Sequence, residues 1–281
     1  MSQNIHAVLV SLSIGVFPNT RQDVDITDEV KAKKALGNGA GKWVKYKLPD
    51  EALSPIRKFA GECRKFHYDH TCCWEDGKRL LSERARQTYD TRMNEFSTEF
   101  FRIVDEFGEE YPNWIEHARI MHAGTFEQSD YPSWSLCRQT FKFVITHEPI
   151  PRPDHFNPEL QRIYGRALEA MTEQKIENAV ADTWDRLLKP VQAMVERLAS
   201  PNAVFRDSLV ENIREVTALV PALNLTGDSR LAEAARLIES QLSNLNPENL
   251  RDSKVDRKEA YERAQQLVAR FGGLGKRKLA A

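Results

Sequence analysis

Cysteine and histidine side chains with the spacing of metal ligands lie close together in the first third of the chain. The candidates are Cys63, His67, His70, Cys72 and Cys73. Positions i, i+4 and i+7 share one side of a helix, and a turn after His70 would bring a thiolate into a tetrahedral zinc site. The first three residues also continue the apolar stripe of residues 53–60, as buried core residues do. Zinc modules usually present two separated ligand pairs, so the spacing favours the core, and no cofactor other than zinc is expected.

Familiar catalytic motifs do not occur in the sequence. The glycine-rich run before Lys42 has Leu36 and Trp43 where a P-loop requires glycine and Ser or Thr. His147-Glu148 is followed by Pro151 at the position of the second histidine of a zinc-protease helix. Neither a Gly-x-Ser-x-Gly elbow nor a deaminase Pro-Cys-x-x-Cys is present. The sequence therefore gives no catalytic residue and favours a protein that is not an enzyme.

Lysines and aromatic rings are interleaved around the same glycine-rich run. Ammonium groups can follow a phosphate backbone while the rings stack on bases. Lysines also protect the edge of a solvated β-hairpin, which explains the segment without any ligand. The candidate nucleic-acid-binding residues are Lys31, Lys33, Lys34, Lys42, Trp43, Lys45, Tyr46 and Lys47.

Two similar pieces, Tyr-Pro-Asn-Trp and Tyr-Pro-Ser-Trp, place pairs of rings three positions apart. Their residues are Tyr111, Trp114, Tyr131 and Trp134. Large aromatic side chains most often fill cores, and here they would hold loops against the sheet. An exposed aromatic patch that binds a partner is the alternative.

The composition is that of a globular chain of one or two domains. It has 281 residues, of which 41% are hydrophobic and 29% charged, with a formal net charge of −1. This charge creates no global attraction to nucleic acid or membrane. The start lacks the basic and apolar regions of a signal peptide, and the crowded cysteines suit reduced thiols. We expect a protein of the bacterial host cytoplasm, with no membrane partner.

Apolar periodicity predicts a mainly helical α+β protein. Alternation with period two predicts strands near residues 8–16, 43–48 and 141–146, which would form a small antiparallel sheet. Spacings of three and four predict the helices. The expected helices cover residues 27–36, 53–70, 89–107, 158–200, 205–219, 228–242 and 256–271.

Two of the expected helices carry heptad seams. One seam runs from Tyr89 to Phe107, and the other from Val180 to Leu198. Matching seams pack as coiled coils do, so we expect a long antiparallel helix pair within the chain, with a homo-oligomeric coil as the alternative. The expected domains are an α+β domain at 1–155, a helical domain with a C-terminal bundle at 156–272, and a flexible basic tail at 273–281.

Several short patterns between residues 9 and 242 resemble a known family. They include Leu53-x-x-Ile56-Arg57, Cys63-Arg64, the turn from Cys73 to Gly77, Tyr111-Pro112-x-Trp114, Phe205-Arg206-Asp207-x-Leu209-x-x-Asn212, and Leu223-Asn224 with Asp228. Together with the opening strand they resemble an uncharacterised family of bacteriophage and integrative-element proteins. Members are often encoded near MoxR- or CobS-type AAA+ ATPases. The resemblance implies a mobile-element setting, with an ATPase or the element's DNA as partner, and transfers no catalytic residue.

Two functions from different classes follow. The first is a non-enzymatic interaction protein of a phage or mobile element, which assembles with itself or with a host-defence or ATPase partner through helical surfaces. The alternative is a DNA-binding accessory protein in recombination or replication, which would use the lysine-rich segment and the basic tail.

Overall fold

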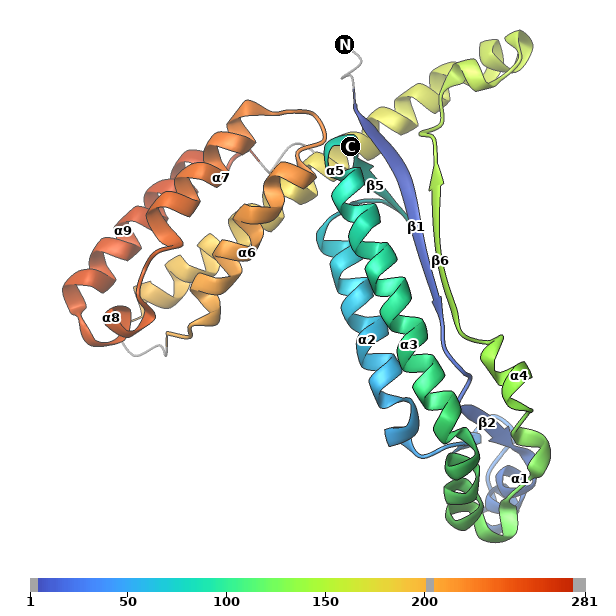
Figure 1. Ribbon diagram of the computed structural model, residues 1–281. Helices are drawn as coiled ribbons and strands as arrows, with labels where there is room; N and C mark the ends of the chain where they lie inside the picture. Colours follow the sequence, from blue (N-terminus) through green and yellow to red (C-terminus); the bar gives the residue numbers. More distant parts are fainter. Residues whose placement is uncertain (1–4, 201–204, 275–281) are drawn as a thin grey trace. The chain divides into compact units, whose positions relative to one another are not determined.

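The computed structural model describes residues 5–200 and 205–274 and is mainly helical (Figure 1). The helices in that part of the chain are α1 (Val24–Lys34), α2 (Asp50–Asp69), α3 (Glu83–His122), α4 (Trp134–Arg138), α5 (Pro158–Ala199), α6 (Ser208–Leu223), α7 (Ser229–Leu242), α8 (Pro247–Asp252) and α9 (Lys254–Phe271). The strands are β1 (Ala7–Gly15), β2 (Thr20–Asp23), β3 (Trp43–Tyr46), β4 (Cys72–Glu75), β5 (Lys78–Ser82) and β6 (Lys142–Glu148). Short 3₁₀ turns are η1 (Ala123–Thr125), η2 (Gln128–Asp130) and η3 (Pro153–His155).

The chain divides into two compact units that differ from the expected boundary at residue 155. Unit 1 contains residues 1–11, 66–90 and 146–281, and unit 2 contains residues 12–65 and 91–145. The 66–90 segment belongs with the C-terminal helices because β4 packs against α5 and β5 against α6. Most of the expected basic tail, residues 275–281, lies outside the described residues.

The expected small antiparallel sheet is present, but only two of its four strands are ones that the sequence indicated. Four strands lie in the order β4-β5-β1-β6, with β5 antiparallel to both β4 and β1. The alternating segments at β1 and β6 are strands as expected. The third, β3, pairs instead with β2 in a separate two-stranded ribbon. The β4–β5 turn contains Gly77 at a φ of +75°, a conformation that glycine adopts without steric cost.

Unit 1 holds its main core between α5, α6, α7 and α9. Leu187, Val191 and Met194 of α5 have no exposed surface and pack with side chains of α6, α7 and α9, among them Ile213, Ile238 and Leu267. A second cluster joins Leu9 of β1 and Leu80 of β5 to the middle of α5. The helices continue through Pro190 and Pro221.

Unit 2 is built around the packing of α2 against α3. Leu53 and Ile56 of α2 share a cluster with Phe100 and Phe107 of α3. The rings of Phe59 and Phe96 lie 5.8 Å apart, edge to face. Phe100, Ile103 and Phe107 of the α3 seam therefore pack in the core of unit 2, whereas the α5 seam packs in the core of unit 1. The expected pairing of these two seams with each other is wrong, because each is already covered by a nearer helix.

No helix in the described part of the chain is both long and apolar enough to cross a lipid bilayer.

Candidate interaction surfaces

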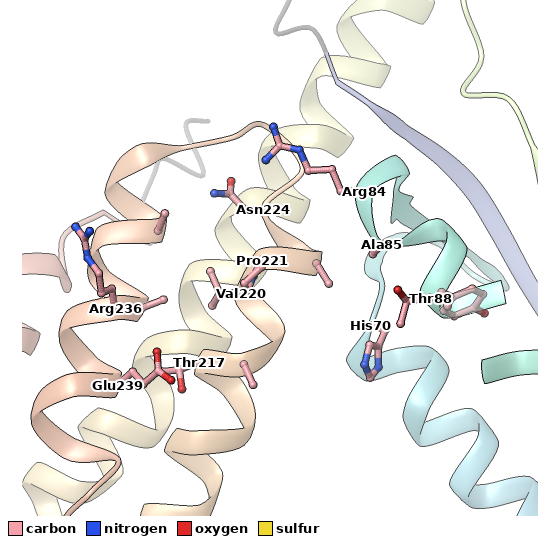
Figure 2. A pocket seen from close by; sticks show the side chains of 15 residues that line it. His70, Arg84, Ala85, Thr88, Thr217, Val220, Pro221, Asn224, Arg236 and Glu239 are labelled. Atoms are coloured by element: carbon pink, nitrogen blue, oxygen red, sulfur yellow. The ribbon is translucent and has the colours of Figure 1, made fainter. Parts of the chain in front are cut away.

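Unit 1 contains a cavity of about 550 Å³ beside α6 (Figure 2). Its wall includes His70 and Thr88 on one side, and Val220 and Pro221 on the other. His70 donates a hydrogen bond from Nδ1 to the carbonyl oxygen of Phe66, 2.9 Å away. The two arginines that line the cavity, Arg84 and Arg236, lie well apart in Figure 2. The two arginines therefore do not converge on one point of the cavity, and Glu239 lies on the side of Arg236.

Unit 1 also carries an exposed apolar face on the first third of α5. Residues 158–171, all of them described, form what we call the α5 outer segment, and Gly165 is its one buried residue. Ile163 and Tyr164 are 52% and 55% exposed, and Met171 is 46% exposed. The α5 outer face consists of Leu160, Ile163, Tyr164, Ala167 and Met171.

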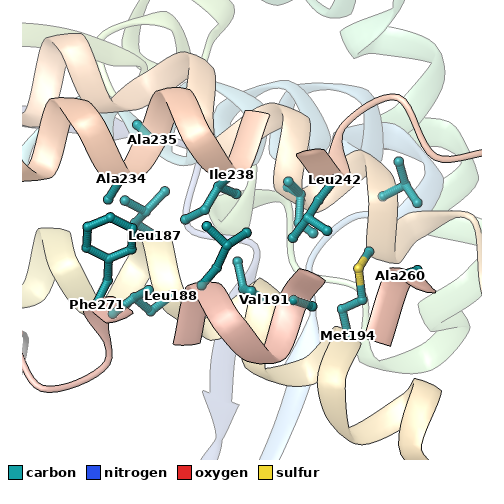
Figure 3. Packing of buried hydrophobic residues seen from close by; sticks show 14 of the residues in the cluster. Leu187, Leu188, Val191, Met194, Ala234, Ala235, Ile238, Leu242, Ala260 and Phe271 are labelled. Carbon is teal, nitrogen blue, oxygen red and sulfur yellow. The ribbon is translucent and has the colours of Figure 1, made fainter. Parts of the chain in front are cut away.

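The same helix buries a second apolar face further along. The α5 inner face consists of Trp184, Leu187, Val191, Met194 and Leu198, all of them in the core (Figure 3). Successive residues of an α-helix are offset by about 100°. Over the twenty positions from Met171 to Val191 this amounts to about five whole turns and a further 200°, so the two side chains point in nearly opposite directions. The outer face therefore points away from the side of α5 on which the core of unit 1 is built.

The segment before α5 packs on the same side as this core. A Cβ on Gly165 would lie 3.5 Å from Pro153 of η3, which places the preceding chain against that side of the helix. Asn157 caps the helix, accepting a hydrogen bond at 2.9 Å from the backbone N–H of Leu160. The outer segment is thus a capped helix that contacts the preceding chain on the side of Gly165, while its apolar face is exposed.

The lysines of the lysine-rich segment of unit 2 do not form one continuous exposed surface. Lys45 is 7% exposed, and its Nζ lies 3.0 Å from Asp130 Oδ2. It also donates a hydrogen bond to the carbonyl oxygen of Thr125, at 3.2 Å. Arg21 pairs with the same aspartate and with Glu127. The inclusion of Lys45 among the nucleic-acid-binding residues is wrong, because its charge is used inside unit 2.

The pair of cations controls the charge of Asp130. Burial by itself would raise the pKa of this carboxyl group, but the contacts with Arg21 and Lys45 outweigh burial and lower it. The aspartate therefore remains ionised, and the network ties β2 and β3 to η2.

Other members of the lysine-rich segment are exposed. Lys33, Lys34 and Lys42 face solvent, and Trp43 and Tyr46 are 51% and 59% exposed. The remaining two lysines have neighbours within unit 2. Lys31 lies 3.9 Å from Asp28, and Lys47 lies over the ring of Phe17. The exposed set surrounds the end of α1 and the start of β3.

The five candidate metal ligands have separate environments. Cys63 belongs to unit 2 and is buried, and burial raises the pKa of its thiol to about 11. His67 Nδ1 lies 2.6 Å from the hydroxyl of Tyr89. Cys72 is buried 3.5 Å from the hydroxyl of Thr183, whereas Cys73 is exposed.

These placements do not produce a ligand set. In the residues that the structure describes, no group of three or more His, Cys, Asp or Glu side chains is arranged to hold a metal ion. Burial, with a smaller contribution from the charge of Arg79, lowers the pKa of His67 to about 4. For Cys63, His67 and Cys72, the structure shows the buried positions that the spacing favoured.

The two Tyr-Pro-x-Trp pieces lie in the core of unit 2. Tyr111 and Tyr131 are buried, and the rings of Tyr111 and Trp134 lie 5.8 Å apart. Tyr131 donates a hydrogen bond to the carbonyl oxygen of Lys47 at 2.7 Å, and Tyr111 donates one to that of Pro132 at 3.0 Å. Trp114 is partly buried against the same cluster. The alternative of an exposed aromatic patch is wrong for the two tyrosines, whose rings hold loops in place.

Sequence reasoning missed the α5 outer face, although its signal was present. Leu160, Tyr164, Ala167 and Met171 follow one another at intervals of four, three and four, the same spacing as the buried seam. Spacing alone does not distinguish an exposed apolar face from a covered one.

Comparison of the chain with protein-family models, curated proteins and solved structures finds no match in any of the three. The surfaces described above are therefore the basis from which a function can be inferred.

Proposed function

We propose that this chain is a non-enzymatic interaction protein that associates with other protein chains through the α5 outer face. The observation that carries the proposal is the exposure of apolar side chains along one side of a formed helix. Contiguous exposed apolar surface is costly in water and marks interaction sites when it is rimmed by polar residues. Arg162 and Glu169 lie on the opposite, polar side of the helix, so the outer segment is amphipathic.

An amphipathic helix is the partner element that fits such a face. Helix-to-helix recognition uses anchors at intervals of three and four residues, which is the spacing of Leu160, Tyr164, Ala167 and Met171. Binding costs little conformational entropy in this chain, because α5 is already held as a helix by its packing further along the chain. In the mobile-element setting that the family resemblance implies, a host-defence protein or an AAA+ ATPase in the bacterial cytoplasm is the proposed partner.

The test compares two variants that introduce the same residue at adjacent exposed positions. Ile163→Glu places a charge in the outer face, and Arg162→Glu places one on the polar side. Tagged chains are expressed in the bacterial host, and proteins that co-purify are identified, purified and recombined for light scattering. We expect a stoichiometric complex with the wild type and with Arg162→Glu, and its loss with Ile163→Glu. Equal complex formation by all three chains, or no complex with any of them, would contradict the proposal.

A second candidate function is binding of single-stranded DNA by unit 2. The specific observation in its favour is that Lys33, Lys34 and Lys42 are exposed beside the exposed rings of Trp43 and Tyr46. Ammonium groups would contact phosphates while the rings stack on bases.

Fluorescence anisotropy with labelled single-stranded DNA at two salt concentrations tests this candidate. Three phosphate contacts predict a fall in affinity of about tenfold to twentyfold for a fourfold rise in salt. The triple variant Lys33→Gln, Lys34→Gln, Lys42→Gln should reduce binding, whereas Lys258→Gln on α9 should not. Absence of binding at low salt would remove this candidate.

A further inference from the structure

Leu160, Tyr164, Ala167 and Met171 form the seam of the α5 outer face, and the residues beside this outer seam carry no charge that would select a partner. In coiled coils, the positions that flank the seam usually hold charged residues that set partner choice and orientation. Here these flanking positions are occupied on one side by Ile163 and Ala170 and on the other by Gln161 and Leu168. Two copies of the face can therefore approach each other without repulsion between like charges. A surface that binds itself must be complementary to itself, and uncharged flanks meet that condition.

The sizes of the seam residues favour one orientation. In a parallel pair, Tyr164 would face Tyr164 of the second copy and Ala167 would face Ala167, giving one crowded layer and one empty layer. In an antiparallel pair centred between residues 165 and 166, Tyr164 faces Ala167 and Leu160 faces Met171. Each layer then has a similar volume, which is the condition for close packing without voids.

We propose that the α5 outer face binds the same face of a second copy of this chain in antiparallel orientation. The inference rests on the proposed function and takes a second copy of this chain, in place of a host-defence protein or an ATPase, as the occupant of that surface.

The length of the seam determines how tight this association is. The outer segment is about 21 Å long at 1.5 Å per residue, which allows two heptads of contact. An interface of this length lies at the low end of specific protein–protein interfaces, where complexes are weak and reversible. The helix need not be nucleated on binding, since α5 continues into the core of unit 1. We therefore expect a dimer with a dissociation constant in the micromolar range, on the order of 10 µM.

Sedimentation equilibrium of the full chain from about 1 to about 200 µM measures the association, over a range that brackets such weak complexes. We expect the wild type to pass from monomer to dimer. Ala167→Arg should weaken dimerisation at least tenfold, because it places a charge in the seam. The matched control Glu169→Arg adds the same side chain on the polar side and should leave dimerisation unchanged. Circular dichroism checks that both variants melt as the wild type does.

Disulfide cross-linking tests the orientation. In a Cys73→Ser background, a Tyr164→Cys chain and an Ala167→Cys chain carrying tags of different size are oxidised separately and as a mixture. An antiparallel pair predicts a mixed disulfide in the mixture and little product from either chain alone. Cross-linking of Tyr164→Cys with itself would overturn the antiparallel orientation.

The failures of the two proposals are distinguishable. A wild type that stays monomeric at the highest concentration overturns the second-copy inference. If such a chain still forms the complex that Ile163→Glu abolishes, the proposed function stands with a different occupant. If neither association occurs, both proposals fail.

Discussion

The outer and inner faces of α5 have similar residue types and similar spacing, yet one is exposed and the other buried. The inner face lies against α6, α7 and α9, which fold back onto it. The outer face is rotated by about half a turn, away from those helices. Apolar periodicity therefore shows that a helix has an apolar face. Whether that face is buried depends on the helices that follow in the chain. The contrast separates residues that stabilise the fold from residues available for binding.

Truncation of one side chain from each face should have very different effects on stability. Leu187→Ala removes buried methyl groups from the inner face and should lower the free energy of unfolding by about 3 kcal/mol. Ile163→Ala on the outer face should change it by less than about 0.5 kcal/mol. Urea denaturation at a concentration where the chain is monomeric measures both. Similar losses for the two variants would show that the outer face is covered in the folded chain.

Acid should weaken the surroundings of the inner part of α5 and leave the outer face unaffected. Arg186 of α5 donates a hydrogen bond to the carbonyl oxygen of Tyr68 at 3.0 Å, next to the buried His67. Burial lowers the pKa of His67 to about 4, so the unfolded chain takes up a proton near pH 6.5 while the folded chain does not. Stability is complete above pH 6.5 and falls as the pH drops toward 4, by about 3 kcal/mol in total.

The check on this pH dependence is urea denaturation between pH 7 and pH 4.5. His67→Gln removes the titrating group and should flatten the pH dependence. The outer face contains no histidine or carboxylate, so dimerisation of the folded chain should be unchanged over the same range, from pH 7 to pH 4.5. An equally steep loss of stability in His67→Gln would assign the effect to other groups.

Thiol reactivity sharpens the same contrast between covered and uncovered positions. Cys72 packs against Thr183 of α5, and burial raises the pKa of its thiol. Cys63 and Cys137 are also buried, whereas Cys73 is exposed. A thiol reagent should modify Cys73 rapidly in the native chain and the other three only after unfolding. Rapid modification of Cys72 would mean that the packing of β4 against α5 opens readily.

The salt dependence of binding should distinguish the outer face from the lysine-rich part of unit 2. The change expected for dimerisation through the outer face is the smallest of these effects. Raising salt leaves an apolar seam unchanged or slightly strengthened. Binding of DNA through Lys33, Lys34 and Lys42 would weaken. Sedimentation equilibrium at two salt concentrations measures the first effect, and a marked loss of dimer at high salt would indicate that charges hold it.

Local patterns in the sequence predicted most of the helices and part of the sheet, but α4 and α8 were not expected and α3 extends beyond residues 89–107 at both ends. The alternation in β1 and the unbroken run of α5 are visible in the residues themselves. The strands β4 and β5 were missed because each is short and its residue types do not alternate between apolar and polar, although the burial of β4 does alternate. The heptad seams of α3 and α5 were found, but the helices that cover them were assigned wrongly, because the spacing of apolar residues does not identify the helix against which they pack.

The candidate sites were less predictable than the fold. Lys45 looked like a member of a basic surface, but Asp130, which neutralises it, lies 85 residues away along the chain, and no local pattern reports such a pairing. His67 and Cys72 have side chains that bind metals, but their burial depends on tertiary packing. The spacing of the apolar residues of the α5 outer face was visible in the sequence, but the sequence did not show that this face is exposed.

Methionine oxidation of the unmodified chain compares the two faces most directly. Met171 on the outer face is 46% exposed, and Met194 on the inner face has no exposed surface. Treatment of the dilute native chain with hydrogen peroxide, followed by peptide mapping, should show Met171 converted to the sulfoxide much faster than Met194. The rate at Met171 should fall at concentrations where the chain dimerises. Equal rates at the two methionines, or slow oxidation of Met171 in the dilute monomer, would contradict the claim that the outer face is free to bind.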